Sequence, residues 1–232
     1  ALTFETRFRS TSNAATDSLI SYNNTNGGDV FRANILGDGT MSFRVQSGAG
    51  WTASAIDYGA ALRDGAVHTF TLSWDNSGNA NIYIDGQFVE STTGLGVGAT
   101  LDGGGTLVIG QEQDALEDGF VLSQALNATL FDVRLFDAVR SASDIGSSYA
   151  STLPFDEPSM IANWRFDDYS TDNIVTESVA GNNLELRHVH ASGFSAGIPA
   201  LSFEVDENSA SATIVGRVAA NDAEREALIS LL

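Results

Sequence analysis

Apolar and polar residues alternate along several short stretches of the sequence. Within residues 2–9, Phe4 and Phe8 fall on one face of an extended chain, whereas Glu5 and Arg7 fall on the other. The same alternation recurs over residues 41–46, 68–74 and 81–84. A period of two indicates β-strands with one buried face, because successive side chains of a strand point to opposite sides. The chain is therefore expected to fold mainly into strands.

Tight-turn signals separate these stretches. Asp38-Gly39 and Asp85-Gly86 are typical of two-residue hairpins, and residues 75–78 predict a longer turn. The chain has 23 glycines and only 3 prolines, so Gly, Asn and Asp are expected to make most of the turns. Many short strands joined by such turns predict an all-β fold, a sandwich of two antiparallel sheets.

One short helix is expected among the strands. Ser141 is its predicted N-cap, and Asp144 stands at the third helical position, where a carboxylate completes a pattern that resembles a capping box. The helix is expected to run to about Tyr149.

The chain is strongly acidic. It has 30 Asp and Glu against 11 basic residues, all of them arginine, and a net charge of −19. Nucleic acids and anionic membrane surfaces are therefore not expected as partners, because both require a basic footprint. The acidity instead indicates binding of divalent cations, life in saline, calcium-rich water, or an ordinary solvated acidic surface.

Cysteine is absent, so no disulfide stabilises the fold, which fits a bacterial protein better than an animal one. Export remains compatible with this absence, since a core of this size can be stable without disulfides. No apolar run approaches the length of a membrane span, and no transmembrane segment is expected.

Residues 107–116 place oxygen-bearing side chains directly after an apolar run. Gly110 ends the run, and Glu112, Gln113 and Asp114 follow it. In an extended chain Glu112 and Asp114 point the same way, so their charges repel unless a cation binds between them. Calcium takes about six to eight oxygen ligands from carboxylates, amides and carbonyls. The run therefore indicates a Ca²⁺ site.

This run resembles the calcium loop of the pentraxin family, whose pattern is I-x-G-Q-E-Q-D. Further blocks resemble pentraxin segments in the same order, at residues 19–22, 67–86, 124–136 and 163–165, and the second of these is also similar to laminin-G-like domains. Together they span about residues 2 to 168. The resemblance implies a concanavalin A-like jelly-roll sandwich with Ca²⁺ as its cofactor.

The resemblance also implies a set of calcium ligands. Glu112, Gln113 and Asp114 match the triplet that serves both calcium ions of the family, and Gln124 matches a ligand of the second ion. The second-site glutamate of the family falls at Val121, which cannot ligate a metal. The first site is thus expected, whereas the second lacks one carboxylate.

Three more acidic residues are candidate ligands. Where the family has an Asp-Asn pair, this chain has Gly28 and Asp29, so that Asp29 can still serve. Glu117 and Asp118 stand where the family has glycines and could replace the missing carboxylate.

The composition changes near residues 192–199, which are rich in Gly, Ser and Ala and end in proline. Residues 1–199 are expected to form the sandwich, and residues 200–232 a linker followed by the truncated start of another domain. Residues 201–222 resemble the first two strands of a bacterial cadherin-like repeat. A segment of this length cannot form a core of its own.

Trp51 is the candidate for stacking on a sugar, because it follows the small residues 48–50, whereas Trp74 and Trp164 lie in alternating segments that predict core positions.

The chain is not expected to be an enzyme. Residues 193–197 fit G-x-S-x-G, but the helix and the downstream histidine that this motif requires are missing. Glu112 and Asp114 could in principle act as an acid and a base, as strand carboxylates do in sandwich-fold glucanases, which keeps an enzyme as an alternative.

The expected function is calcium-dependent ligand binding, in which a glycan or another polar or anionic ligand completes the coordination of the metal. The cadherin-like resemblance implies a large extracellular or cell-surface bacterial protein of the adhesin type, with this module as a monomer. Two alternatives remain. In one, calcium only rigidifies the loops of a structural sandwich; in the other, the chain is an accessory domain of a polysaccharide-degrading enzyme.

Overall fold

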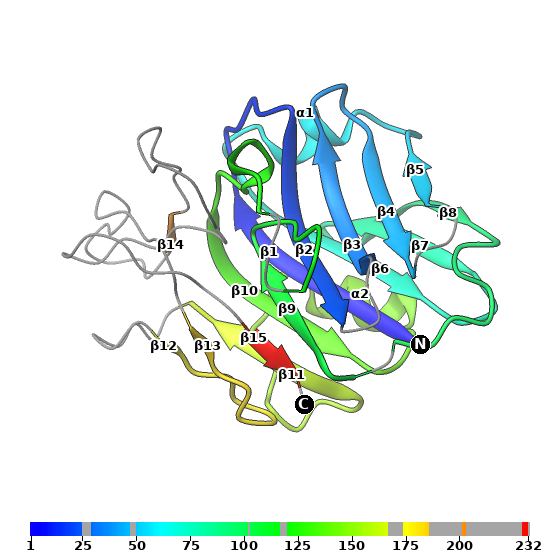
Figure 1. Ribbon diagram of the computed structural model, residues 1–232, viewed down its shortest axis with the longest axis vertical. Coiled ribbons are helices and arrows are strands. Elements are labelled where there is room, and N and C mark those ends of the chain that lie inside the picture. The colour runs from blue at the N-terminus through cyan, green and yellow to red at the C-terminus, as the bar shows by residue number, and fades with distance from the viewer. Residues whose placement is uncertain are drawn as a thin grey trace.

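Two antiparallel sheets lie face to face (Figure 1). The structure is a computed structural model that describes residues 1–24, 29–46, 50–101, 103–116, 120–166, 174–185, 201–202 and 229–231. The arrangement confirms the predicted all-β jelly-roll sandwich.

The first sheet has the strand order β11-β10-β1-β6-β7-β8, and β14 pairs with β10 outside this path. Its strands are β1 (Leu2–Arg9), β6 (Val67–Trp74), β7 (Ala80–Ile84), β8 (Gln87–Thr92), β10 (Thr129–Phe136), β11 (Met160–Arg165) and β14 (Leu201–Ser202). The predicted strand segments near residues 2, 68 and 81 all lie in this sheet.

The second sheet has the order β15-β9-β2-β3-β4-β5. Its strands are β2 (Thr16–Asn24), β3 (Asp29–Leu36), β4 (Met41–Val45), β5 (Trp51–Ala53), β9 (Gly105–Ile109) and β15 (Ile229–Leu231). Two short strands, β12 (Ile174–Val175) and β13 (Leu184–Glu185), pair separately. The candidate site is built on β2, β3 and β9 of this second sheet.

The core fills the space between the sheets with the apolar faces that the alternation predicts. Phe70 of β6 lies 6.4 Å from the ring of Phe4 in its own sheet and stacks at 6.2 Å on Phe43 of β4 in the opposite sheet. Trp74 and Trp164 are buried, as expected from their strand positions. The core therefore uses one face of each sheet, and the other face remains for polar residues.

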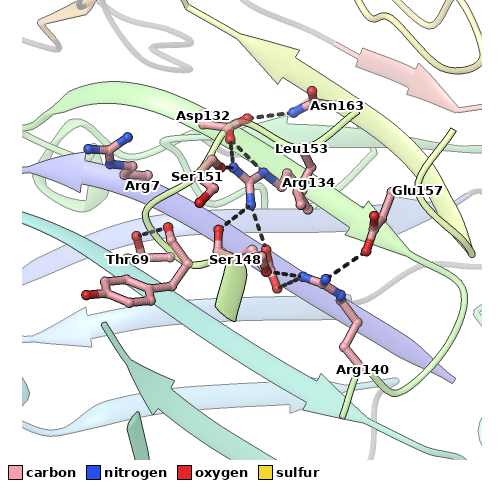
Figure 2. A network of polar contacts seen from close by, with 12 residues as sticks. Arg7, Thr69, Asp132, Arg134, Arg140, Ser148, Ser151, Leu153, Glu157 and Asn163 are labelled. Atoms are coloured by element: carbon pink, nitrogen blue, oxygen red, sulfur yellow. Dashed lines mark hydrogen bonds and ion pairs between the residues drawn. The ribbon is translucent and has the colours of Figure 1, made fainter. Parts of the chain in front are cut away.

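The outer face of the first sheet carries a buried network of charges beneath α2 (Ala142–Ser148) (Figure 2). Arg140 donates to Glu5 at 2.7 Å and to Glu157 at 3.0 Å. Arg134 donates to Glu5 at 3.2 Å and also pairs with Asp132. These contacts fasten the helix and the following loop to the sheet, because both guanidinium groups also bind Ser148 of the helix.

The predicted helix is confirmed as α2, with Ser141 as its N-cap accepting from the backbone N–H of Asp144 at 3.1 Å. The prediction of a single helix is corrected, since a second one, α1, covers Tyr58–Leu62, and a 3-10 turn covers Leu122–Gln124. Asp57 caps α1 through the N–H of Ala60 at 2.8 Å. A helix of five residues is too short for helical periodicity to be visible in the sequence.

The C-terminal region is described only at two strands that pair with the sandwich. Ser202 pairs with Thr129 of β10, and Ile229 pairs with Leu107 of β9. The rest of the cadherin-like segment, residues 203–222, lies outside the described residues, so the boundary at residue 199 stays a prediction. In the part of the chain that the structure describes, no helix has the length and apolar character needed to cross a membrane.

Candidate metal and ligand site

A closed loop leaves the second sheet after β9 and returns beside the point of departure. Gly110, with a φ of 82°, turns the chain out of the strand, and its N–H donates to the carbonyl of Leu19 at 3.1 Å. Its carbonyl accepts from the N–H of Leu126 at 2.8 Å. Because one residue ties the start of the loop to β2 and also holds its end, the segment 111–125 is anchored at both ends.

Gln113 fastens this loop to the outer face of β2 and β9. Its backbone N–H donates to Ser21 Oγ at 3.1 Å, and its side-chain amide donates to the carbonyl of Thr106 at 2.7 Å. Asn23 Nδ2 donates to the carbonyl of Gln113 at 2.8 Å. Gln113 is fully buried, so its side chain is a structural anchor and its backbone carbonyl faces the polar residues of β2.

Glu112 is buried on the same face, with 2% of its surface exposed. Its Oε1 forms an ion pair with Arg32 of β3. Its Oε2 accepts from Gln124 Nε2 at 2.5 Å and from Asn34 Nδ2 at 3.4 Å. The expected repulsion between Glu112 and Asp114 is therefore not what this geometry shows, because an arginine balances Glu112 and Asp114 is exposed.

Three side chains that contact Glu112 or Gln113 each have a buried amide oxygen without a hydrogen-bond partner among the described residues. They are Oδ1 of Asn23, Oδ1 of Asn34 and Oε1 of Gln124. In each of these side chains the amide nitrogen donates to Glu112 or Gln113. A buried acceptor without a donor is costly, and oxygens of this kind are the ligands that calcium prefers. The donor set therefore fits a hard cation.

The structure describes the remaining predicted ligands only in part. Asp29 opens β3 directly opposite Asn23, which places its backbone at the end of the sheet that holds the Gln113 carbonyl. Its side chain, Glu117 and Asp118 lie outside the described part of the structure. Val121 is 44% exposed and offers only its carbonyl, which accepts from Gln111 Nε2 at 3.0 Å. Within the described residues, no three Asp, Glu or His side chains form a metal-binding group.

Trp51 is not brought together with these residues. It lies on β5 at the opposite edge of the sheet, two strands beyond β3. Its ring is partly buried and packs 5.2 Å from the ring of Phe43. Part of its surface therefore belongs to the core, and its role in ligand binding stays a prediction.

Arg32, Asn34 and Asn23 complete the site but are not among the residues expected from the sequence. Arg32 and Asn34 occupy the polar phase of the alternation in β3, between the buried Phe31, Ala33 and Ile35. This alternation is the sequence signal that could have indicated both residues, since it places their side chains on the outer face of the sheet. It could not reveal which loop covers them.

Comparison with known proteins places the chain in a family. Residues 1–146 match the family model of the concanavalin A-like lectin/glucanases superfamily. A segment of 95 residues is 38% identical to the sushi, von Willebrand factor type A, EGF and pentraxin domain-containing protein 1 of Rattus norvegicus. The match covers 40% of this chain but only 3% of the rat protein, so it concerns a small part of a much longer protein.

Two solved structures share the fold. A heptameric SAP-like pentraxin from Limulus polyphemus superposes with a TM-score of 0.57 and 21% identity, over 69% of this chain and 78% of the other. A candidate carbohydrate-binding protein from Bacteroides ovatus also has a TM-score of 0.57, with 13% identity, over 78% of this chain and 50% of the other. Since the family model matches more than half of the residues, the chain belongs to the concanavalin A-like lectin/glucanases superfamily, and its sandwich is similar to that of the pentraxins.

Proposed function

We propose that the chain is a calcium-dependent, lectin-like binding module whose ligand is a glycan or another polar or anionic molecule. The observation that carries the proposal is the set of three partnerless amide oxygens on side chains that contact Glu112 or the carbonyl of Gln113. Asp114, exposed at the end of this group, and the acids at positions 29, 117 and 118 would supply the further charge that a divalent cation requires.

A bound cation gives an acidic module a way to hold a polar ligand. Calcium accepts more oxygens than one loop provides, so the coordination positions left open can be filled by sugar hydroxyls or by a carboxylate. The metal also inverts the local sign of the charge, which matters in a chain with a net charge of −19. The resemblance in fold to a candidate carbohydrate-binding protein supports a glycan as the first ligand class to test.

The setting is part of the proposal. We place the module, as a monomer, in an extracellular or cell-surface protein of the adhesin type, because residues 201–222 resemble the start of a cadherin-like repeat. A gel-filtration measurement of the mass in solution, with and without calcium, tests the monomer.

A glycan array, run once in calcium and once in chelator, tests the function. Glycan binding is expected in calcium only, and Asp114→Asn is expected to weaken it by at least about tenfold, the effect of losing one charge-assisted ligand. Asp156→Asn is the matched control, since Asp156 is equally exposed but lies in the loop between α2 and β11. Binding that persists in chelator would refute the calcium dependence.

A second candidate function is favoured by the closed form of the loop. Because Gly110 ties both ends of the loop, calcium could act on stability alone. In that case calcium would raise the melting temperature, by mass action on the folded state, while the array stayed empty. Release of reducing ends from polysaccharides would instead indicate the enzymatic alternative.

A further inference from the structure

We infer that Arg32 is a built-in counter-ion of this loop and that it competes with calcium for Glu112. The inference rests on the proposed calcium site and concerns the regulation of that site. It is carried by the ion pair between Arg32 Nη1 and Glu112 Oε1, together with the burial of Glu112 and the partial burial of Arg32. It predicts that the loop keeps its folded form without metal and that calcium binds more weakly than the oxygen donors alone would allow.

The pair is held by the sheet itself. Arg32 lies near the middle of β3, opposite Ser21 of β2, whose hydroxyl accepts from the N–H of Gln113. The side chain of Arg32 is 17% exposed and that of Glu112 is 2% exposed. At such burial a charge pair is screened little by water, and an unpaired carboxylate would be strongly unfavourable. Arg32 therefore balances the negative charge of Glu112, as a bound metal ion would in a loop without this arginine.

Calcium and Arg32 would compete for the negative charge of Glu112. Oε1 is occupied by the guanidinium group, and Oε2 already accepts from Asn34 and Gln124. If calcium displaces the guanidinium group, this buried ion pair is lost. The loss of the pair opposes the exchange of arginine for calcium, and removal of the arginine should ease calcium binding.

The first measurement uses the unmodified chain. Hydrogen exchange in chelator should show protected amides at Gln113 and Leu126, whose N–H groups bind Ser21 and Gly110. Calcium should change this protection little. Loss of protection at both amides in chelator would show that the loop needs a metal to fold, and it would overturn the inference without any variant.

The second measurement compares variants by calorimetric titration with calcium chloride. Arg32→Gln should tighten calcium binding by about tenfold or more, a change equal to about 1.4 kcal/mol. Arg44→Gln is the matched control, because it removes the same charge from the position facing Arg32, whereas the ion pair of Glu112 is with Arg32. It should tighten binding much less. Arg32→Gln should also lose loop protection in chelator and regain it with calcium.

The outcomes separate the two proposals. If the unmodified chain binds calcium and Arg32→Gln binds it no more tightly, the competition is refuted while the proposed function stands. If Arg44→Gln tightens binding as much as Arg32→Gln, the effect is one of general charge, and the inference is refuted as well. If no variant binds calcium, the proposed function is wrong and the inference falls with it.

Discussion

Replacement of Glu5 by glutamine should be among the most damaging conservative changes in the chain. Glu5 is 2% exposed and is shared by two buried arginines, Arg134 at 3.2 Å and Arg140 at 2.7 Å. The variant Glu5→Gln keeps the shape of the side chain but removes its charge. Each arginine then keeps one carboxylate, Asp132 or Glu157.

The magnitude follows from burial. Removal of one partner from a buried ion pair costs about 3 to 5 kcal/mol. Because each arginine retains another partner, we expect the lower end, about 3 kcal/mol. In a chain of this size 1 kcal/mol corresponds to roughly 2 to 4 °C, so the melting temperature should fall by roughly 6 to 12 °C.

Glu157→Gln is the matched control. It makes the same chemical change on a carboxylate that binds the same Arg140, at 3.0 Å, but that is 24% exposed. Water screens this pair, so the expected loss is about 1 kcal/mol or less. Urea unfolding at pH 7, followed by the fluorescence of the buried Trp74 and Trp164, gives both values. The reasoning would be refuted if Glu157→Gln destabilised the fold as much as Glu5→Gln.

Two further predictions concern pH and packing. Burial lowers the pKa of His68, but its hydrogen bonds to Asp85 at 2.8 Å and Asp64 at 3.0 Å outweigh this and raise the pKa above its ordinary value. A raised histidine pKa stabilises the fold below the unfolded pKa of about 6.5 and loses that effect as pH rises through the folded pKa. The stability difference between the unmodified chain and His68→Gln, from urea unfolding, should therefore shrink from pH 6 to pH 9, and a constant difference would contradict this. Gly105→Ala should destabilise the fold by about 1 to 3 kcal/mol and weaken calcium binding, because its Cβ would lie 2.1 Å from the carbonyl of Asn23. Gly103→Ala is the control, since a Cβ at this position would have no atom within 4 Å. Equal melting temperatures of the two variants would argue against the clash.

The sequence predicts the sandwich well because the signal is local. Alternation assigns Phe4, Phe43 and Phe70 to buried faces, and each of them lies in the core. The helix α1 is missed because its five residues are too few to show a helical repeat of apolar positions, and Asp57 is its only N-terminal signal. Local patterns thus report the strands well and the shortest elements poorly.

The site is less accessible to such reasoning. The rule that alternate residues point the same way holds only inside a strand, and the chain leaves its strand at Gly110. Glu112 can therefore be buried while Asp114 is exposed. The pair of Glu112 with Arg32 joins residues that are distant in the sequence, and nothing in the loop itself indicates which charge on β3 it meets.

The alternation in β3 and β4 separates what folds the chain from what faces the loop. Phe31, Ala33 and Phe43 point into the core, whereas Arg32 and Asn34 point outward. A change at an outward position leaves the core contacts in place but alters the contacts made with Glu112. The two faces of one strand are thus constrained by different chemistry, the inward face by packing and the outward face by the charge and the amide that hold the loop.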